Sequence, residues 1–225
     1  MRTSPGVSRR GWFAIAALAV SLVLVLVLCA AWAVRSLWPA PTSPSRYVEV
    51  VHGVYRLAQP DALVGFELVK HDETPFGNAA LKDRWSFLIF GYTFCPDFCP
   101  TTLVVFNELH RLLAQQPGGV RDVQFVMVTV DPQRDTPKQL KAYVPQFNPE
   151  FIGVTGNAPV ITRLADSLGA VFEKHSGSNG AGYLMDHSST AYLIDPQGRL
   201  RAVFAPPHVA VDMAAGFQKI RLPAP

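Results

Sequence analysis

Two continuous apolar runs constrain the fold of this chain more than any other feature of its sequence. Residues 86–92 read SFLIFGY and residues 123–130 read VQFVMVTV. Runs of this length without alternation are typical of strands covered on both faces. Each run is followed by a segment with helical features, 101–115 and 136–144, and Thr136 and Pro137 suit the cap and first position of the second helix. The runs therefore predict buried strands in a layered α/β fold.

The remaining segments fit the same architecture. We expect short strands at 66–69 and 151–154, a turn at 71–78, and a helix at 158–168 that Asn157 caps and Gly169 ends. An extended segment at 171–174 precedes a mobile Gly/Ser loop at 175–182. A hairpin of strands 190–194 and 200–204 follows, with its turn at 195–198, and then a helix at 209–220. This order predicts an α/β fold with a thioredoxin-like mixed sheet flanked by helices.

The N-terminal region predicts a membrane anchor. Residues 12–34 carry no charge and are long enough to cross a hydrocarbon core of roughly 30 Å. Arg2, Arg9 and Arg10 precede this run, which places residues 1–11 in the cytoplasm and the rest of the chain outside. Ala31 to Ala33 has the form of a signal-peptide cleavage site, but the apolar run is longer than such peptides need. An uncleaved single transmembrane helix is favoured, although cleavage stays open.

The net positive charge of the chain indicates its orientation in the membrane rather than an anionic partner. The formal net charge is +3, yet the first 35 residues contain four arginines and no acidic residue. The rest is nearly neutral, which argues against nucleic-acid binding. Residues 35–47 are rich in Pro and Ser and predict a tether, so residues 48–225 are expected to form the working domain.

A close cysteine pair marks the candidate site of that domain. Cys29 lies in the predicted anchor, so the domain has only Cys95 and Cys99, within the segment GYTFCPDFCPTTL. They follow a buried strand and precede a helix, the edge where open α/β sheets place their chemistry. A helix N-terminus favours the thiolate, which binds metals and attacks disulfides. The C-x-x-x-C spacing departs from the C-x-x-C redox motif, but it leaves both metal binding and redox chemistry open.

Three segments carry a family resemblance. GYTFCPDFCPTTL at 91–103, VDPQRDTP at 130–137 and DHSSTAYLIDPQG at 186–198 resemble the Sco/SenC family in order and rough spacing. The resemblance covers nearly the whole predicted domain. It implies a thioredoxin-like, membrane-tethered protein that binds copper through two cysteines and one histidine. It also implies delivery of copper to the binuclear centre of cytochrome c oxidase, or reduction of the cysteines of that centre, or both.

His187 is the candidate third ligand because of its position. It lies just before the strand that begins at Thr190, and in thioredoxin-like folds the start of this strand lies beside the cysteine loop. Oxidoreductases of this fold usually have a cis-proline there, whereas this chain has no proline between Pro159 and Pro196. Two thiolates and an imidazole suit Cu(I), whereas structural zinc usually needs a fourth protein ligand. His175 is either an auxiliary ligand or an exposed loop residue, and ordinary surface or core roles are expected for the others, namely His52, His71, His110 and His208.

Several charged residues near these segments have two interpretations. Asp186 either orients the His187 imidazole or is a plain loop residue, and Asp97 is either a weak ligand or a surface residue. Asp131 and Pro132 are expected at the rim of the site. Arg134 and Asp135 either dock a partner or cap the following helix.

The leading hypothesis is a metallochaperone that holds one copper per chain through Cys95, Cys99 and His187. The alternatives are a thiol–disulfide oxidoreductase that uses Cys95 and Cys99 as its redox-active pair, or a copper or redox sensor; whether the chain is an enzyme stays open. The expected partners are the copper-bearing subunit of cytochrome c oxidase and another periplasmic copper chaperone as donor. The short N-terminus favours the bacterial inner membrane, with the domain in the periplasm.

Overall fold

The computed structural model describes residues 22–30, 46–176 and 182–221. The chain divides into two units, Met1–Ser45 and Arg46–Pro225. Within the first unit, residues 22–30 are helical with exposed side chains. Most of the predicted anchor at 12–34 and of the tether at 35–47 lies outside the described residues. None of the helices in the described ranges is long and apolar enough to cross a membrane.

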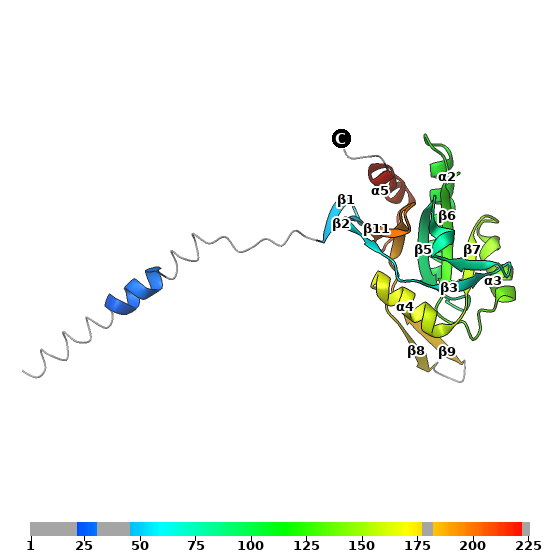
Figure 1. Cartoon of the computed structure of the whole chain (residues 1–225), viewed down its shortest axis with the longest axis horizontal. Coiled ribbons are helices and arrows are strands. Elements are labelled where there is room, and N and C mark those ends of the chain that lie inside the picture. Colours follow the sequence, from blue (N-terminus) through cyan, green and yellow to red (C-terminus); the bar gives the residue numbers. More distant parts are fainter. Residues whose placement is uncertain (1–21, 31–45, 177–181, 222–225) are drawn as a thin grey trace, which may run out of the picture. The chain divides into compact units, whose positions relative to one another are not determined.

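The second unit is built on a nine-stranded mixed sheet with the order β1-β2-β11-β10-β5-β6-β7-β3-β4 (Figure 1). Strands β5, β6 and β7 are parallel, and the other neighbouring pairs in this sheet are antiparallel. The bounds of the strands are β1 Tyr47–Val51, β2 Val54–Ala62, β3 Glu67–Lys70, β4 Pro75–Gly77, β5 Trp85–Gly91, β6 Val123–Thr129, β7 Ile152–Thr155, β10 Ala191–Ile194 and β11 Arg199–Phe204.

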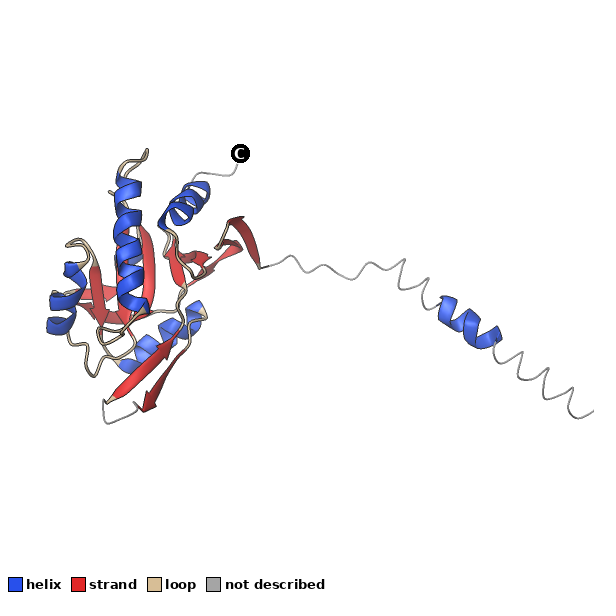
Figure 2. Cartoon of the chain, turned by 180° about the vertical axis from the view of Figure 1, so that it is seen from behind, coloured by secondary structure: helices blue, strands red, loops and turns tan. Residues whose placement is uncertain are grey.

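Helices cover both faces of this sheet (Figure 2). Buried side chains of α2 (Phe98–Ala114), α3 (Pro137–Tyr143) and α5 (Ala210–Arg221) form one core with one face of the sheet. The helix α4 (Ala158–Leu168) packs in the second core on the other face. Short 3-10 helices lie at Asn78–Leu81 and Val144–Gln146. This arrangement confirms the predicted mixed sheet flanked by helices.

The apolar run of β5 has no exposed face because it supplies both cores. All seven of its residues are buried. Phe87 belongs to the first core, where its ring stacks on Phe125 at a centroid distance of 5.2 Å, and Leu88 belongs to the second core. The predicted start of α3 is also confirmed: the Thr136 side chain accepts a hydrogen bond from the backbone N–H of Gln139.

Four predicted boundaries were wrong. The predicted turn at 71–78 contains β4, because the Phe76 side chain is buried and residues 75–77 pair with β3. The predicted loop at 175–182 begins with two residues of β8 (Phe172–Ser176), which pairs with β9 (Tyr183–His187) in a separate two-stranded sheet. Residues 177–181 lie outside the described residues. Helix α2 begins at Phe98 rather than 101, and β1 begins inside the predicted tether.

The sheet register brings three loops to one edge. Gly91 pairs with Thr129 at the carboxyl ends of parallel β5 and β6. The antiparallel β10 begins at Ala191, which lies opposite Ile89. The cysteine segment after β5, the 130–136 segment after β6 and the 187–190 segment before β10 therefore meet at this edge.

Candidate metal centre

The two cysteines lie on either side of the start of α2. Cys99 is in the first turn of the helix and is 2% exposed, whereas Cys95 is in the preceding loop and is partly exposed. A turn closes this loop, since the backbone N–H of Cys95 donates to the carbonyl of Tyr92 at 3.2 Å. The backbone N–H of Cys99 faces the Cys95 sulfur at 3.5 Å. The first helical turn therefore offers a polar contact to a sulfur anion.

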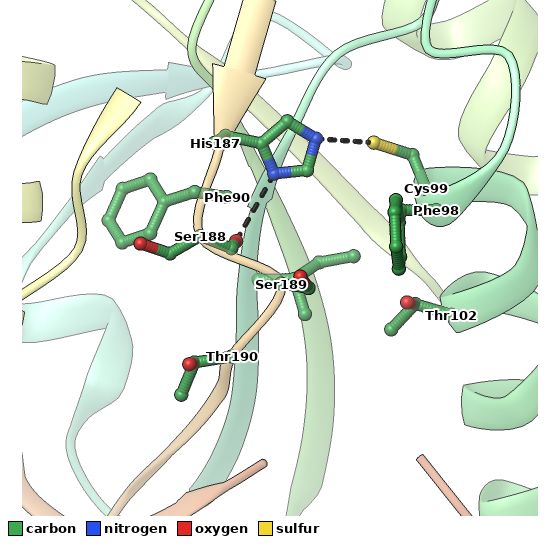
Figure 3. Close-up of a pocket in the computed structure, with 9 residues that line it drawn as sticks. Phe90, Phe98, Cys99, Thr102, His187, Ser188, Ser189 and Thr190 are labelled. Carbon is green, nitrogen blue, oxygen red and sulfur yellow. Dashed lines mark hydrogen bonds between the residues drawn. The ribbon is translucent and has the colours of Figure 1, made fainter. Parts of the chain in front are cut away.

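His187 faces the cysteines from the last residue of β9. Its Nε2 lies 3.3 Å from the Cys99 Sγ, and its Nδ1 lies 3.1 Å from the Ser188 carbonyl oxygen (Figure 3). A carbonyl oxygen only accepts, so Nδ1 carries a proton, and Nε2 is the ring nitrogen that faces the sulfurs. The ligand atoms of Cys95, Cys99 and His187 all lie within 4.8 Å of one another.

The protonation of the two sulfurs differs. A hydrogen bond from Cys99, helped by His187 and by backbone N–H groups, lowers the pKa of Cys95 to about 3. The same hydrogen bond and burial raise the pKa of Cys99. Burial alone would lower the pKa of His187, but hydrogen bonds to Cys95 and Ser188 raise it overall. The metal-free site therefore holds one thiolate and one thiol, and a metal that binds both sulfurs displaces the remaining proton.

Gly91 and Tyr92 form the floor of the site. A Cβ atom added at Gly91 would lie 2.8 Å from the Cys99 Sγ, so the sulfur sits directly on the strand backbone. The Tyr92 hydroxyl accepts a hydrogen bond from the backbone N–H of Met185 at 3.3 Å. The Tyr92 and His187 rings meet edge to face, with centroids 5.9 Å apart.

Asp135 is fully buried, and its carboxylate holds the cysteine loop in place. Its carboxylate accepts hydrogen bonds from the Thr93 backbone N–H at 2.9 Å, the Thr93 hydroxyl at 2.6 Å and the Thr129 hydroxyl at 2.7 Å. Burial, the largest influence, raises the pKa of Asp135. Asp135 thus neither docks a partner nor caps α3, since Thr136 is the cap. Both of its predicted roles were wrong.

Replacing Asp135 with alanine is expected to lower the free energy of unfolding by about 1–3 kcal/mol, because the buried Thr129 hydroxyl and the partly buried Thr93 N–H would lose their hydrogen-bond partner. Chemical denaturation of the full chain measures this loss. Asp97→Ala is the matched control, because Asp97 is exposed and its side chain makes no cap hydrogen bond. Equal stabilities of the two variants would contradict the role of Asp135.

Arg134 connects the cysteine loop with β9. It forms an ion pair with Asp131, and its Nη1 donates to the Tyr183 carbonyl at 3.0 Å. Its guanidinium carbon lies 4.8 Å from the centroid of the Phe94 ring. Asp131 lies in the adjacent loop, as predicted for the rim, but Arg134 is engaged within the domain rather than free to dock a partner.

The other candidate ligands lie apart from the sulfurs. Asp186 is paired with His175, with 3.0 Å between Oδ2 and Nε2, so it does not orient the His187 ring. Of the remaining histidines, His52 is exposed, His71 Nδ1 accepts from the Gly153 N–H, His110 pairs with Glu150 and His208 Nε2 donates to the Ser189 carbonyl. Within the described ranges, Cys95, Cys99 and His187 are the one group found that fits a metal ion. Gly91, Tyr92 and Tyr183 also shape the site, and the sequence did not predict them.

Comparisons with known proteins agree with this site. The model of the SCO1/SenC family matches residues 57–221. A "Putative copper-binding protein" of Stutzerimonas stutzeri is 42% identical over 149 residues, which are 66% of this chain and 71% of that protein. An SCO2-like protein of Rickettsia conorii is 38% identical over 135 residues, which are 60% of this chain and 64% of that protein.

Solved structures show the same relationship. The copper-bound ScoI of Arabidopsis thaliana has a TM-score of 0.66 and 31% identity, covering 71% of this chain and 97% of that structure. The copper-bound ScoI of Bradyrhizobium japonicum has a TM-score of 0.62 and 30% identity, covering 71% of this chain and 99% of that structure. Since the family model spans most of the sequence and the thioredoxin-like Sco fold is shared, the chain belongs to the SCO1/SenC family.

Proposed function

We propose that this protein is a copper metallochaperone whose cargo binds to Cys95, Cys99 and His187. The observation that carries the proposal is the convergence of these three donors at one sheet edge, with their ligand atoms within 4.8 Å of one another. Two soft sulfurs and one imidazole match the preference of copper, and structural zinc would usually need a fourth protein ligand. The copper-bound relatives support the same metal.

The unequal exposure of the ligands suits transfer by ligand exchange. Cys95 is partly exposed, whereas Cys99 is buried against Gly91. Thiols of a partner reach Cys95 first, while Cys99 and His187 still hold the cargo. Two half-exposed rings, Phe94 and Phe98, flank Cys95 and offer apolar area to that partner.

The cellular location of the protein and its partners are also part of the proposal. We infer that residues 12–34 anchor the chain in the bacterial inner membrane and that the domain works in the periplasm. The expected recipient is the copper-bearing subunit of cytochrome c oxidase, and another periplasmic copper chaperone is the expected donor. The absence of charge over residues 12–34 and the arginines before it support this topology.

One observation favours a second candidate, a thiol–disulfide oxidoreductase. The low pKa of Cys95, caused chiefly by the hydrogen bond from Cys99, keeps a thiolate beside a thiol. Such a pair reduces a partner disulfide: the Cys95 thiolate attacks one sulfur, and Cys99 then resolves the mixed disulfide with transfer of two electrons. Copper binding and this reaction use the same sulfurs, so a direct comparison is needed.

A transfer experiment separates the two candidates. The full chain, purified in detergent and loaded with Cu(I), is mixed with the metal-free, reduced copper-binding domain of the oxidase subunit, and copper is measured in each protein after separation. In a second arm, the metal-free reduced chain meets the oxidised domain, and free thiols are counted. Movement of copper is expected. Retention of copper together with reduction of the partner disulfide would instead support the oxidoreductase.

A further inference from the structure

The strand that carries His187 is attached to the domain mainly through side chains. Strand β9 pairs only with β8 among the described residues, so it receives no ladder of hydrogen bonds from the nine-stranded sheet. Alternate residues face the domain: Tyr183, Met185 and His187 make the contacts, whereas Leu184 and Asp186 are exposed. The position of His187 therefore depends on how firmly the inward-facing residues are held.

Tyr183 is held by contacts at both its hydroxyl and its ring. Its hydroxyl donates to Asp131 Oδ1 at 2.7 Å, and Asp131 is 3% exposed. The Arg134 guanidinium carbon lies 3.7 Å from the centroid of the ring, and the Lys174 ammonium lies 3.6 Å from it. Two cations at such short distances must lie on opposite faces of the ring. Tyr183 is thus fixed at its hydroxyl and clamped across both faces.

Arg134 holds the two sides of the metal centre together. It binds β9 through the Tyr183 ring and carbonyl, and it packs against the ring of Phe94, the residue before Cys95. The ion pair with Asp131 fixes the guanidinium itself. One side chain therefore couples the strand that carries the histidine to the loop that carries the exposed cysteine.

His187 has space to move if this attachment loosens. A shallow groove that is open to solvent lies beside it, lined by residues of β8, β9 and their flanks, including Phe172, Asp186 and Ser188. Within the described residues, the imidazole is held directly by its contacts with the Cys95 and Cys99 sulfurs, the Ser188 carbonyl and the edge of the Tyr92 ring. Displacement of β9 would thus separate the nitrogen ligand from the sulfurs.

We propose that Arg134, Tyr183 and Asp131 form a latch that keeps β9 against the cysteine loop and thereby sets the rate at which copper leaves the centre. Arg134 and Tyr183 are positioning residues, because they touch neither sulfur and act through His187. This inference rests on the proposed function. Opening of the latch removes the imidazole from the cargo and leaves copper on two sulfurs, which a partner thiol displaces more readily.

Two conservative variants test the latch in the full chain. Tyr183→Phe keeps the ring between the cations and removes only the hydroxyl, and Arg134→Lys keeps the charge and loses the planar fork. The Cu(I)-loaded proteins are mixed with excess chelator, and the dissociation rate is followed. Each variant is expected to release copper about tenfold faster than the wild type, the factor expected for one lost hydrogen bond to a charged group. Arg111→Lys, on the exposed surface of α2, is the control and is expected to match the wild type.

A second readout separates positioning from general damage. The Cu(II)-loaded variants are expected to keep the electron paramagnetic resonance signature of a nitrogen ligand, because His187 still binds when the latch is closed. The latch would be overturned, and the proposed function left standing, if both variants release copper at the wild-type rate. The same holds if they release it no faster than an equally destabilised variant whose substitution lies in the core at α5, such as Ile220→Val. If the wild-type chain itself retains no copper, the proposed function fails and the latch fails with it.

Discussion

Replacing His187 with alanine is expected to lower the affinity for Cu(I) by at least about 100-fold. The imidazole is the single nitrogen among the three ligands, and even the loss of an outer partner of a metal ligand typically costs 10- to 100-fold. Disulfide exchange should stay largely intact, because the hydrogen bond from Cys99 is the main cause of the low pKa of Cys95. Competition with a chromophoric Cu(I) chelator measures the affinity, and reaction with an aromatic disulfide measures the exchange.

His52→Ala is the matched control for this change, because His52 is exposed in the turn between β1 and β2. It is expected to bind copper as the wild type does. Wild-type copper affinity in His187→Ala would contradict the role of the histidine. An oxidase that still assembles in cells carrying His187→Ala, without copper retained on the protein, would contradict the metallochaperone proposal itself.

Replacing Gly91 with alanine is expected to disturb the centre although all three ligand residues are kept. The new Cβ would lie 2.8 Å from the Cys99 Sγ and 3.5 Å from Met127 Cε. Strand β5 is in the middle of the sheet and cannot shift easily, so the sulfur must move, which disturbs its 3.3 Å contact with His187 Nε2. Overpacking of this kind typically costs about 1–3 kcal/mol of stability. We expect a loss of stability in this range and a fall in copper affinity of about tenfold or more.

Gly65→Ala is the control for this substitution, since no atom lies within 4 Å of the Cβ that it would add. Denaturation curves and chelator competition are measured on both variants. A Gly91→Ala protein with wild-type copper affinity would show that the Cys99 sulfur has more freedom than its contact with the strand implies.

The sequence predicted the central part of this molecule well, because strong local patterns determine it. The structure has buried strands at the two apolar runs (β5 and β6), a cap at Thr136 and a helix end at Gly169, as predicted. Each of these sequence patterns is compatible with essentially one local structure. The convergence of Cys95, Cys99 and His187 was also predicted. That prediction needed the expected position of the strand after His187, since the cysteines alone left redox and metal chemistry open.

The missed features depend on contacts between distant segments. Asp135 appeared to be a helix cap because it precedes Thr136, but its partners Thr93 and Thr129 lie on two other segments. Glycines and serines within 175–182 suggested a loop there, so the pairing of β8 with β9 was not predicted. In hindsight, the alternation of Tyr183, Met185 and His187 was the available signal for β9.

The most direct test of the central claim is the copper content of the reduced full chain. The protein is loaded with Cu(I), passed over a gel-filtration column and washed with a weak chelator, and copper is measured per chain. We predict one copper per chain for the wild type, and none retained when Cys95, Cys99 or His187 is replaced. A substoichiometric content that the weak chelator strips from the wild type would contradict the account.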